Sequence, residues 1–457
     1  MPGMREGHVS CLNRSLVVRF CLSLFFLLLW RYVPQPQASE DAASNLPTLK
    51  TIPSSLYSQT MLTPEEIQVD AKSAVLMDGA TGQILLAHNP HLQIPPASFA
   101  KLMTLYIVFD AIKHRKIELQ DEVWVSKKAW KTGGSKMFIE VNTKVPVEAL
   151  IKGIAVVSGN DASVAIAEHL YGDTDTFTRV MNKYAKQLGM QRSQFGNPHG
   201  FPGPEQQTTA HDMALLARSY ISNFPEALSI HAMQSYTYNG IQQPNRNGLL
   251  KRDPSVDGLK TGWVEKAGYN LVATSNRDQH RLIAVVMGAA SSVIREREAL
   301  KLLNYGHLNF QLITFAHADE LVATLPVWQG TLDSIPILTA PSNPIVLPRE
   351  KANQIRQVQV LPKDIIAPIE KNQILGKLLI TLGTERIYSI PLVAGQAVGK
   401  ASFPKAFIHQ IYLNGFKPSI ALLVIGASAL IFCAAAIFFV LGNRRRKKPR
   451  YRTRFVR

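Results

Sequence analysis

The stretch Ala74-Val-Leu-Met-Asp-Gly-Ala-Thr-Gly-Gln-Ile-Leu-Leu-Ala87 reads as a strand, a turn supplied by glycine, and a second strand. Pro95 and Pro96 follow, and they prevent a helix from starting before Ser98. From Ser98 onwards apolar residues recur on one helical face. The sequence therefore predicts a hairpin that leads into a helix.

The region up to residue 310 continues with helices and closes with strands. The periodicity predicts, in chain order, helices over 146–170, 174–188 and from about Thr209, strands over 269–275 and 281–287, and a helix over 292–304. Strands at both ends with helices between them indicate an α/β (α+β) layer architecture in which the terminal strands share one sheet.

The sequence changes character after Phe310. Short β-rich runs alternate with Pro and Gly, and residues 377–382 and 386–393 read as a hairpin. We expect a small all-β domain over 315–405, without clustered acids, bases or nucleophiles.

The net charge of +17 is concentrated at the two ends of the 457-residue chain. Residues 444–457 hold nine basic residues and no acid, and residues 1–38 hold four basic residues and one Glu. Without these ends 37 basic and 32 acidic residues remain, a net charge of only +5. This distribution indicates membrane topology, and it gives no reason to expect a nucleic-acid partner.

The two ends predict export and anchoring. Residues 1–38 combine a basic region with a short apolar run and read as a signal peptide, followed by a polar segment over 39–64. Residues 419–442 are uncharged and long enough for a transmembrane helix, and 443–457 form a basic tail that favours the cytoplasm. A buried N-terminal helix and a nuclear-localisation tail are the alternatives, and each explains only one end.

Three short patterns carry the candidate chemistry: Ser98-Phe-Ala-Lys101, Ser158-Gly-Asn160 and Lys260-Thr-Gly262. Ser402-Phe-Pro-Lys405 and Lys131-Thr-Gly133 fit two of these patterns as well. The first of these two contains an interior proline, and the second lies in a polar loop. The order of the motifs along the chain and their structural surroundings therefore favour the three patterns named first.

Ser98 and Lys101 suit nucleophilic catalysis. Positions i and i+3 share a helical face, so the Ser98 hydroxyl and the Lys101 amine can meet. A serine is a poor nucleophile until a base takes its proton, and a lysine with its ordinary pKa of about 10.4 is charged and cannot do so. Burial beside Lys260 would lower the pKa of Lys101 and make it a base.

The remaining residues suit proton relay and substrate binding. Ser158 can pass a proton to the leaving group, and Asn160 can orient Lys101 or the substrate. Lys260 and Thr261 can bind a carboxylate, while Gly262 lets a substrate backbone lie alongside as an added strand. Each residue alone also fits a helix cap, an ordinary turn or a solvated surface position, and only their combination favours a site.

Several longer segments extend these patterns: Pro96-Ala-Ser-Phe-Ala-Lys-Leu-Met-Thr104, Ser158-Gly-Asn-Asp-Ala162, Asn245-Arg-Asn-Gly-Leu-Leu250, Val256-Asp-Gly-Leu-Lys-Thr-Gly262 and Lys266-Ala-Gly-Tyr-Asn-Leu-Val-Ala273. With them, residues 65–405 resemble the low-molecular-mass penicillin-binding proteins that are serine D-alanyl-D-alanine carboxypeptidases. The resemblance implies a transpeptidase/β-lactamase-like catalytic domain over 65–310. It also implies removal of the terminal D-alanine from peptidoglycan stem peptides, acylation by penicillins and other β-lactams, and a place at the bacterial inner membrane facing the periplasm. The twelve histidines are scattered and show no His-Glu-x-x-His spacing, so we expect no metal site, and we expect no cofactor.

The resemblance also implies roles for single residues. Ser98 is acylated, Lys101 is the general base and Ser158 assists proton transfer. Lys260 binds substrate, and Arg246 lies near the substrate. The backbone N–H groups of Ser98 and Trp263 form the oxyanion hole. Relatives often carry His where this chain has Trp263, and they commonly use an amphipathic C-terminal helix where this chain has an apolar run.

Two rival functions share some of these features. A class A serine β-lactamase needs a deacylating Glu between the second and third motifs. Glu205 is the one Glu between Tyr184 and Asp212, and no Asn follows it by four residues. A non-catalytic scaffold that binds cell-wall peptides would not need the Ser98 and Lys101 pair.

Overall fold

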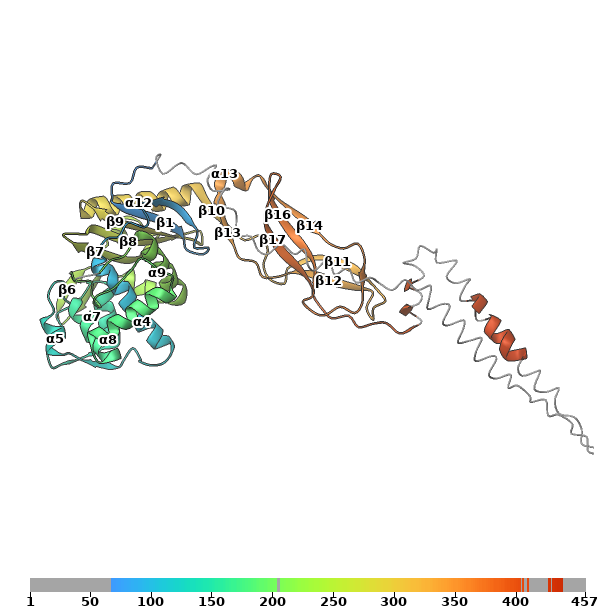
Figure 1. Cartoon of the computed structure of the whole chain (residues 1–457), viewed down its shortest axis with the longest axis horizontal. Coiled ribbons are helices and arrows are strands. Elements are labelled where there is room, and N and C mark those ends of the chain that lie inside the picture. The colour runs from blue at the N-terminus through green and yellow to red at the C-terminus, as the bar shows by residue number, and fades with distance from the viewer. Residues whose placement is uncertain are drawn as a thin grey trace, which may run out of the picture. The chain divides into compact units, whose positions relative to one another are not determined.

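The computed structural model describes residues 67–203 and 206–403, with short pieces over 405–406, 409–410, 426–428 and 430–438 (Figure 1). The predicted signal peptide, the 39–64 segment, the basic tail and much of the predicted 419–442 span lie outside these residues. Within the described parts of the chain, no helix combines the length and apolar character needed to cross a membrane.

A five-stranded antiparallel sheet forms the centre of the N-terminal domain. Its strand order is β2-β1-β9-β8-β7. The strands are β1 (Ser73–Asp78), β2 (Ile84–His88), β7 (Val256–Val264), β8 (Gly268–Arg277) and β9 (His280–Ala289). Strand β1 pairs with β9, for example Val75 with Val285, so the predicted sharing of a sheet by the two ends of the domain is confirmed.

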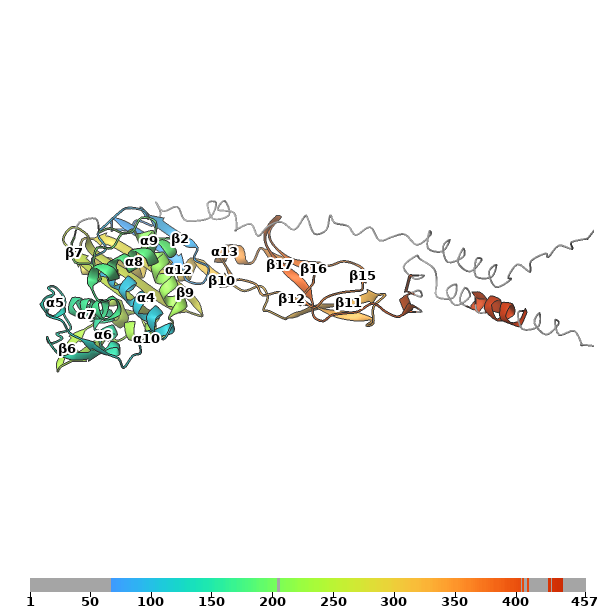
Figure 2. The same cartoon turned by 60° about the horizontal axis from the view of Figure 1, so that its bottom comes forward.

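Helices cover both faces of this sheet (Figures 1 and 2). Helix α12 (Ser292–Asn309) packs on β8 and β9 from one side, and α9 (Ala210–Asn223) packs on β1 and β9 from the other. The remaining helices of the domain are α4 (Ala100–Lys113), α5 (Lys127–Lys131), α6 (Val147–Ala155), α7 (Asn160–Tyr171), α8 (Thr174–Gln187), α10 (Ala227–His231) and α11 (Leu249–Arg252). Two small hairpins complete it: β3 (Glu122–Trp124) with β4 (Lys144–Pro146), and β5 (Ser235–Tyr238) with β6 (Ile241–Pro244).

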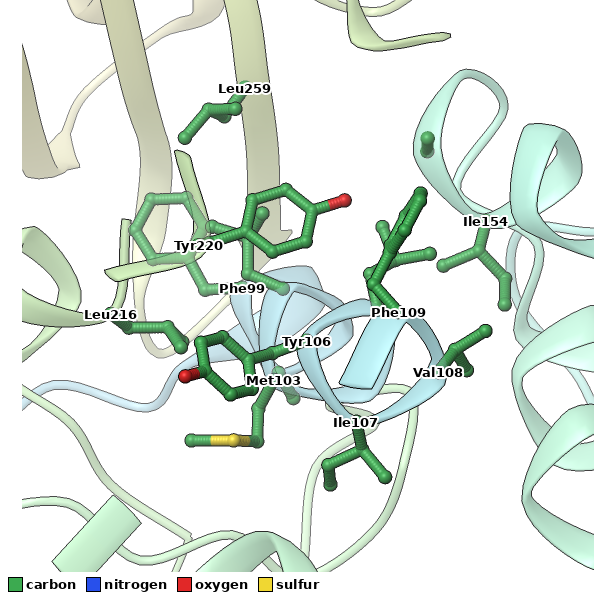
Figure 3. Close-up of a cluster of buried hydrophobic side chains, with 14 of the residues drawn as sticks. Phe99, Met103, Tyr106, Ile107, Val108, Phe109, Ile154, Leu216, Tyr220 and Leu259 are labelled. Atoms are coloured by element: carbon green, nitrogen blue, oxygen red, sulfur yellow. The ribbon is translucent and has the colours of Figure 1, made fainter. Parts of the chain in front are cut away.

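Helix α4 is buried along nearly its whole length. Eleven of its fourteen residues are buried, including Lys101, Met103 and Phe109. Figure 3 shows apolar side chains of this helix, among them Met103 and Phe109, packed with Ile154, Leu216, Tyr220 and Leu259 from the surrounding elements. A helix held on all sides is a rigid support for the residues at its N-terminal end.

Two boundaries differ from the sequence prediction, and both lie at candidate site residues. Ser98 does not open α4; it lies in a single 3₁₀ turn, η1 (Ala97–Phe99), just before that helix. The predicted helix over 146–170 is two helices, with a break at 156–159 that contains Ser158. The apolar run Ile-Ala-Val-Val before Ser158 continues the helical period, so periodicity alone does not reveal this break.

The C-terminal domain is mainly β structure. A six-stranded sheet has the order β14-β16-β17-β12-β11-β15, and β10 pairs with β13. The elements are β10 (Phe310–Ile313), β11 (Leu321–Trp328), β12 (Ser334–Thr339), β13 (Ile345–Pro348), α13 (Arg349–Ala352), β14 (Ile355–Val360), β15 (Ile365–Ile366), β16 (Ile374–Leu382) and β17 (Glu385–Ala394). Strands β16 and β17 form the predicted hairpin, and α13 is one helical turn that the sequence did not predict.

Candidate active site

The three motifs meet at one cleft of the catalytic domain. The cleft encloses about 900 Å³ and takes residues from η1, from the loop after α5, from the α6–α7 connection and from β7. Residues lining it include Ser98, Gly134, Ser135, Ser158, Asn160, His199, Gly200, Phe201, Arg246, Thr261, Gly262, Trp263, Glu265, Tyr269 and Arg295. Lys101 and Lys260 are buried behind this lining.

Ser98 and Lys101 are in contact, as their spacing predicts. Lys101 Nζ lies 3.0 Å from Ser98 Oγ, and it donates a hydrogen bond to the carbonyl oxygen of His199 at 2.7 Å. Lys101 has no exposed surface, while Ser98 is half-buried and lines the cleft. The His199 carbonyl occupies one N–H of the amine, which leaves the nitrogen lone pair free to face the hydroxyl.

Burial lowers the pKa of Lys101 well below its ordinary value, and the positive charges of Lys260 and Arg246 lower it further. Asp161 opposes these effects but does not outweigh them. Burial, Arg246 and Arg295 likewise lower the pKa of Lys260 to about 7. Both amines are therefore far easier to deprotonate than a solvated lysine, as expected for buried amines among like charges.

Ser158 lines the same cleft as Ser98 and has an unusual backbone conformation. Its φ is +63°, in the left-handed region where a side chain costs about 1–3 kcal/mol. Its Oγ is buried and has no hydrogen-bond partner among the described residues. This hydroxyl is therefore not committed to another described group, and strain of this kind is characteristic of functional positions.

Asn160 begins α7, and its amide does not reach Lys101. Asn160 Nδ2 donates to the carbonyl oxygen of Gly133 at 2.7 Å. The next residue, Asp161, is buried and accepts from the backbone N–H groups of Met137 at 3.0 Å and Phe138 at 2.9 Å. Together the two residues fix the loop that supplies Gly134 and Ser135 to the cleft.

Strand β7 forms another wall of the cleft. Thr261, Gly262 and Trp263 line it, and the Trp263 side chain is 55% exposed. A Cβ at Gly262 would lie 3.3 Å from Phe99 Cδ1 and 3.4 Å from Pro96 O. The absence of a side chain at Gly262 therefore lets β7 pack closely against η1. The sequence suggested another role for this glycine, namely to let a substrate backbone approach β7.

Two arginines reach the cleft from different elements. Arg246 was predicted, and it donates to Ser135 Oγ at 2.6 Å. Arg295 from α12 was not predicted; it is 6% exposed and donates to the carbonyl oxygen of Arg246 at 3.1 Å. Its Nε is buried and has no partner among the described residues. A buried guanidinium with a free donor at a cleft is suited to an anionic ligand.

The loop that contains His199 and Gly200 is the other part of the site that the motifs do not reveal. His199 offers its carbonyl oxygen to Lys101, and Gly200 has a φ of +79°. A Cβ on Gly200 would overlap the carbonyl oxygen of Ala97, so only glycine lets this loop approach η1. A main-chain contact leaves no side-chain signature, and this is why sequence reasoning missed it.

Comparison with known families matches both domains. Residues 59–291 match the family model described as D-alanyl-D-alanine carboxypeptidase. Residues 310–400 match the model for the C-terminal domain of penicillin-binding protein 5.

Individual relatives are similar over most of their length. The D-alanyl-D-alanine carboxypeptidase DacA of Haemophilus influenzae is 39% identical over 340 residues, which is 73% of this chain and 86% of that protein. The carboxypeptidase DacD of Escherichia coli is 40% identical over 347 residues, or 74% of this chain and 89% of the relative.

Solved structures agree with these matches. Penicillin binding protein 5 from Haemophilus influenzae has a TM-score of 0.65 at 39% identity, covering 73% of this chain and 99% of that structure. Penicillin binding protein 6B from Escherichia coli has a TM-score of 0.62 at 37% identity, covering 73% of this chain and 98% of that structure. With a cleft of this composition and these relatives, the chain belongs to the D-alanyl-D-alanine carboxypeptidase family of serine peptidases.

Proposed function

We propose that Ser98 is the nucleophile with which this D-alanyl-D-alanine carboxypeptidase removes the terminal D-alanine from peptidoglycan stem peptides. The observation that carries the proposal is the 3.0 Å contact between Ser98 Oγ and Lys101 Nζ. Lys101 is wholly buried and its pKa is lowered, so it can be uncharged and act as a base.

Acylation then uses Ser98, which contacts Lys101, and Ser158, which lines the same cleft as Ser98. Uncharged Lys101 accepts the Ser98 proton while Oγ attacks the carbonyl carbon of the scissile amide. The tetrahedral intermediate collapses when the C–N bond breaks, and the departing amine of D-alanine takes up one proton. Ser158, with its unpartnered hydroxyl, passes that proton from Lys101 to the amine. The products are the acyl ester on Ser98, free D-alanine and an uncharged Lys101.

Other groups at the cleft would bind the substrate and stabilise the oxyanion. The backbone N–H groups of Ser98 and Trp263 would stabilise the oxyanion. The substrate's terminal carboxylate would lie near Thr261, with positive charge supplied by Lys260, Arg246 and Arg295. Arg295 supports this placement, because it lines the cleft and its one ion pair among the described residues is the long contact with Glu296, at 3.9 Å.

Deacylation uses the same groups in reverse. A water molecule attacks the ester carbon and loses one proton to Lys101, and the ester C–O bond breaks. The proton held by Lys101 returns to Ser98 Oγ, which restores the free enzyme and releases the shortened peptide as a carboxylic acid, whose remaining proton passes to solvent. Penicillins would acylate Ser98 by the same first step, because their ring amide presents a carbonyl carbon to the same nucleophile.

The cellular setting is a further part of the proposal. Export through the 1–38 signal and anchoring by a single 419–442 helix would place the catalytic domain on the periplasmic side of the inner membrane. The basic 443–457 tail would remain in the cytoplasm. Deletion of residues 418–457 should move the enzyme from the membrane fraction to the soluble fraction, whereas retention in the membrane would contradict this anchor.

The activity is tested by release of D-alanine from a peptide ending in D-alanyl-D-alanine. Wild-type protein should release D-alanine and take up one penicillin, found by mass spectrometry on the peptide that carries Ser98. Ser98→Ala should do neither while keeping the fold. Labelling that persists in Ser98→Ala, or an adduct on Ser158 or Ser402, would overturn the assignment.

A further inference from the structure

Two neighbouring side chains of α12 hold the loop that carries Arg246, between β6 and α11. Arg295 Nη2 donates to the carbonyl oxygen of Arg246 at 3.1 Å, and Glu296 Oε1 accepts from the backbone N–H of Gly248 at 3.2 Å. Both of these α12 side chains are buried. One helix therefore binds a carbonyl group and an N–H group that lie two residues apart in the same loop.

The Glu296 carboxylate fills the space where Gly248 has no side chain. A Cβ at Gly248 would lie 2.5 Å from Glu296 Oε2 and 2.7 Å from Glu296 Oε1. The backbone of Gly248 has a φ of −65° and a ψ of −17°, a conformation that any L-residue adopts. Glycine is therefore needed here for the room that it gives the carboxylate, not for its conformational freedom.

Two asparagines attach the same loop to other elements. Asn245 Nδ2 donates to the carbonyl oxygens of His231 at 3.1 Å and Met233 at 2.9 Å, at the end of α10. Asn247 Nδ2 donates to the carbonyl oxygen of Gly258 in β7 at 3.1 Å. The loop is thereby fixed to α10 and to β7, and α12 supplies a third attachment.

Arg246 is the residue of this loop that lines the cleft. Its side chain is exposed and donates to Ser135 Oγ at 2.6 Å, and its positive charge lowers the pKa of Lys101 and of Lys260. An exposed arginine has many rotamers, and binding a carboxylate costs less when the backbone that carries the arginine is already fixed. The position of the loop therefore affects how well Arg246 can bind an anion.

We infer that Glu296 is a positioning residue for the proposed reaction, which through the N–H of Gly248 holds the loop so that Arg246 faces the substrate carboxylate. The inference rests on the proposed function, which places that carboxylate near Arg246. Glu296 is not among the described residues that line the cleft, so it acts through the loop. Its other contact, 3.3 Å from Oε2 to Arg252 Nη2, is a partly exposed ion pair and contributes little.

Two peptides test the inference, one ending in D-alanyl-D-alanine and one with that terminal carboxylate amidated. Glu296→Ala leaves the Gly248 N–H without its acceptor and should lower kcat/KM for the first peptide about tenfold, chiefly through KM. The amidated peptide should lose much less, because it has no anion for Arg246. Glu296→Gln keeps an oxygen acceptor and should retain most of the activity.

Glu298→Ala is the matched control for this loss. Glu298 is a buried carboxylate on the same helix, and it pairs with Arg297 and Lys301 of that helix. The variant should destabilise α12 but leave the ratio of kcat/KM between the two peptides unchanged.

Gly248→Ala tests the same contact from the loop. Its backbone conformation suits alanine, but the added Cβ must displace the Glu296 carboxylate. This variant should therefore show the same selective loss on the first peptide, and it decides the question if Glu296→Ala does not fold.

A double-mutant cycle shows whether Glu296 acts through Arg246. In an Arg246→Gln background, Glu296→Ala should cost less than about twofold, because residues that act through one another do not contribute additively. An undiminished loss in that background, or an equal loss on both peptides, would overturn the positioning role and leave the proposed function intact. Absence of D-alanine release by the wild type would overturn the proposed function and this inference with it.

Discussion

The amine of Lys101 donates a hydrogen bond to the main-chain carbonyl of His199, 2.7 Å away and 98 residues further along the chain. The same nitrogen lies 3.0 Å from Ser98 Oγ. The His199 carbonyl thus sets the direction of the amine toward the serine. Burial, with Lys101 nearby, lowers the pKa of the His199 imidazole to about 3, so this side chain stays neutral and adds no charge beside the lysine.

Gly200→Ala should uncouple this loop from the site. A Cβ there would overlap the carbonyl oxygen of Ala97, and the φ of +79° is unfavourable for alanine. We expect penicillin acylation to fall at least tenfold, since the His199 carbonyl must move. Gly203→Ala is the matched control, because the nearest atoms to its Cβ would lie 4.0 Å away. Equal acylation rates for the two variants would show that the loop does not position Lys101.

Arg295→Gln should weaken recognition of the substrate carboxylate. A charge-assisted hydrogen bond to a carboxylate contributes about 1.5–3 kcal/mol, which corresponds to a loss of about 10- to 100-fold in kcat/KM. The loss should be much smaller with a peptide whose terminal carboxylate is amidated. Arg179→Gln, an exposed arginine on α8, serves as the control. An equal loss on both peptides would assign Arg295 a purely structural role.

Ser158→Gly and Ser158→Ala should differ in stability although both lack the hydroxyl. At a φ of +63° glycine is unstrained, so Ser158→Gly should have the larger free energy of unfolding, by about 1 kcal/mol. Both should lose about 10²-fold or more of the hydrolysis rate if the hydroxyl relays a proton. Urea denaturation measures the first effect and D-alanine release the second. Higher stability in Ser158→Ala would argue against strain at this position.

Lys260 should make stability depend on pH. Its pKa is about 7 when folded and 10.5 when solvated, so between these values the unfolded chain binds more protons. Stability from this group therefore rises with pH by about 1.4 kcal/mol per unit in that window and is lost as pH falls toward 7. Between about pH 7.5 and 9.5 wild type should gain on the order of 2 kcal/mol more than Lys260→Met. Equal gains would mean that Lys260 is not held with a lowered pKa.

Much of the fold follows from patterns visible in the sequence. Glycine-bounded hairpins and apolar alternation predict strands β1, β2, β8 and β9, and β16 with β17 in the second domain. The break at 156–159 does not follow, because tertiary contacts rather than local sequence end α6 there. The positive φ of Ser158 could not be predicted from the local sequence either. It lies beside α7, whose Asp161 carboxylate holds the backbone of the loop at Met137.

The candidate site also has parts that the sequence predicts and parts that it does not. The Ser98 and Lys101 contact follows from their spacing, because it needs only one turn of the chain. Arg295 stands in Ile294-Arg-Glu-Arg-Glu298, a run of alternating charges that is typical of a solvated helix face. Its burial comes from the packing of α12 against β8 and from its bond to the Arg246 carbonyl, 49 residues earlier in the chain.

Acylation of Lys101→Arg by a fluorescent penicillin tests most directly whether uncharged Lys101 takes the proton of Ser98. Arginine keeps a positive charge at this position but does not deprotonate in proteins. If Lys101 is the base, the acylation rate should fall by about 10²–10⁴, as for the loss of a positioned general base, while circular dichroism shows an intact fold. A folded Lys101→Arg that is labelled at Ser98 as fast as wild type would contradict this mechanism.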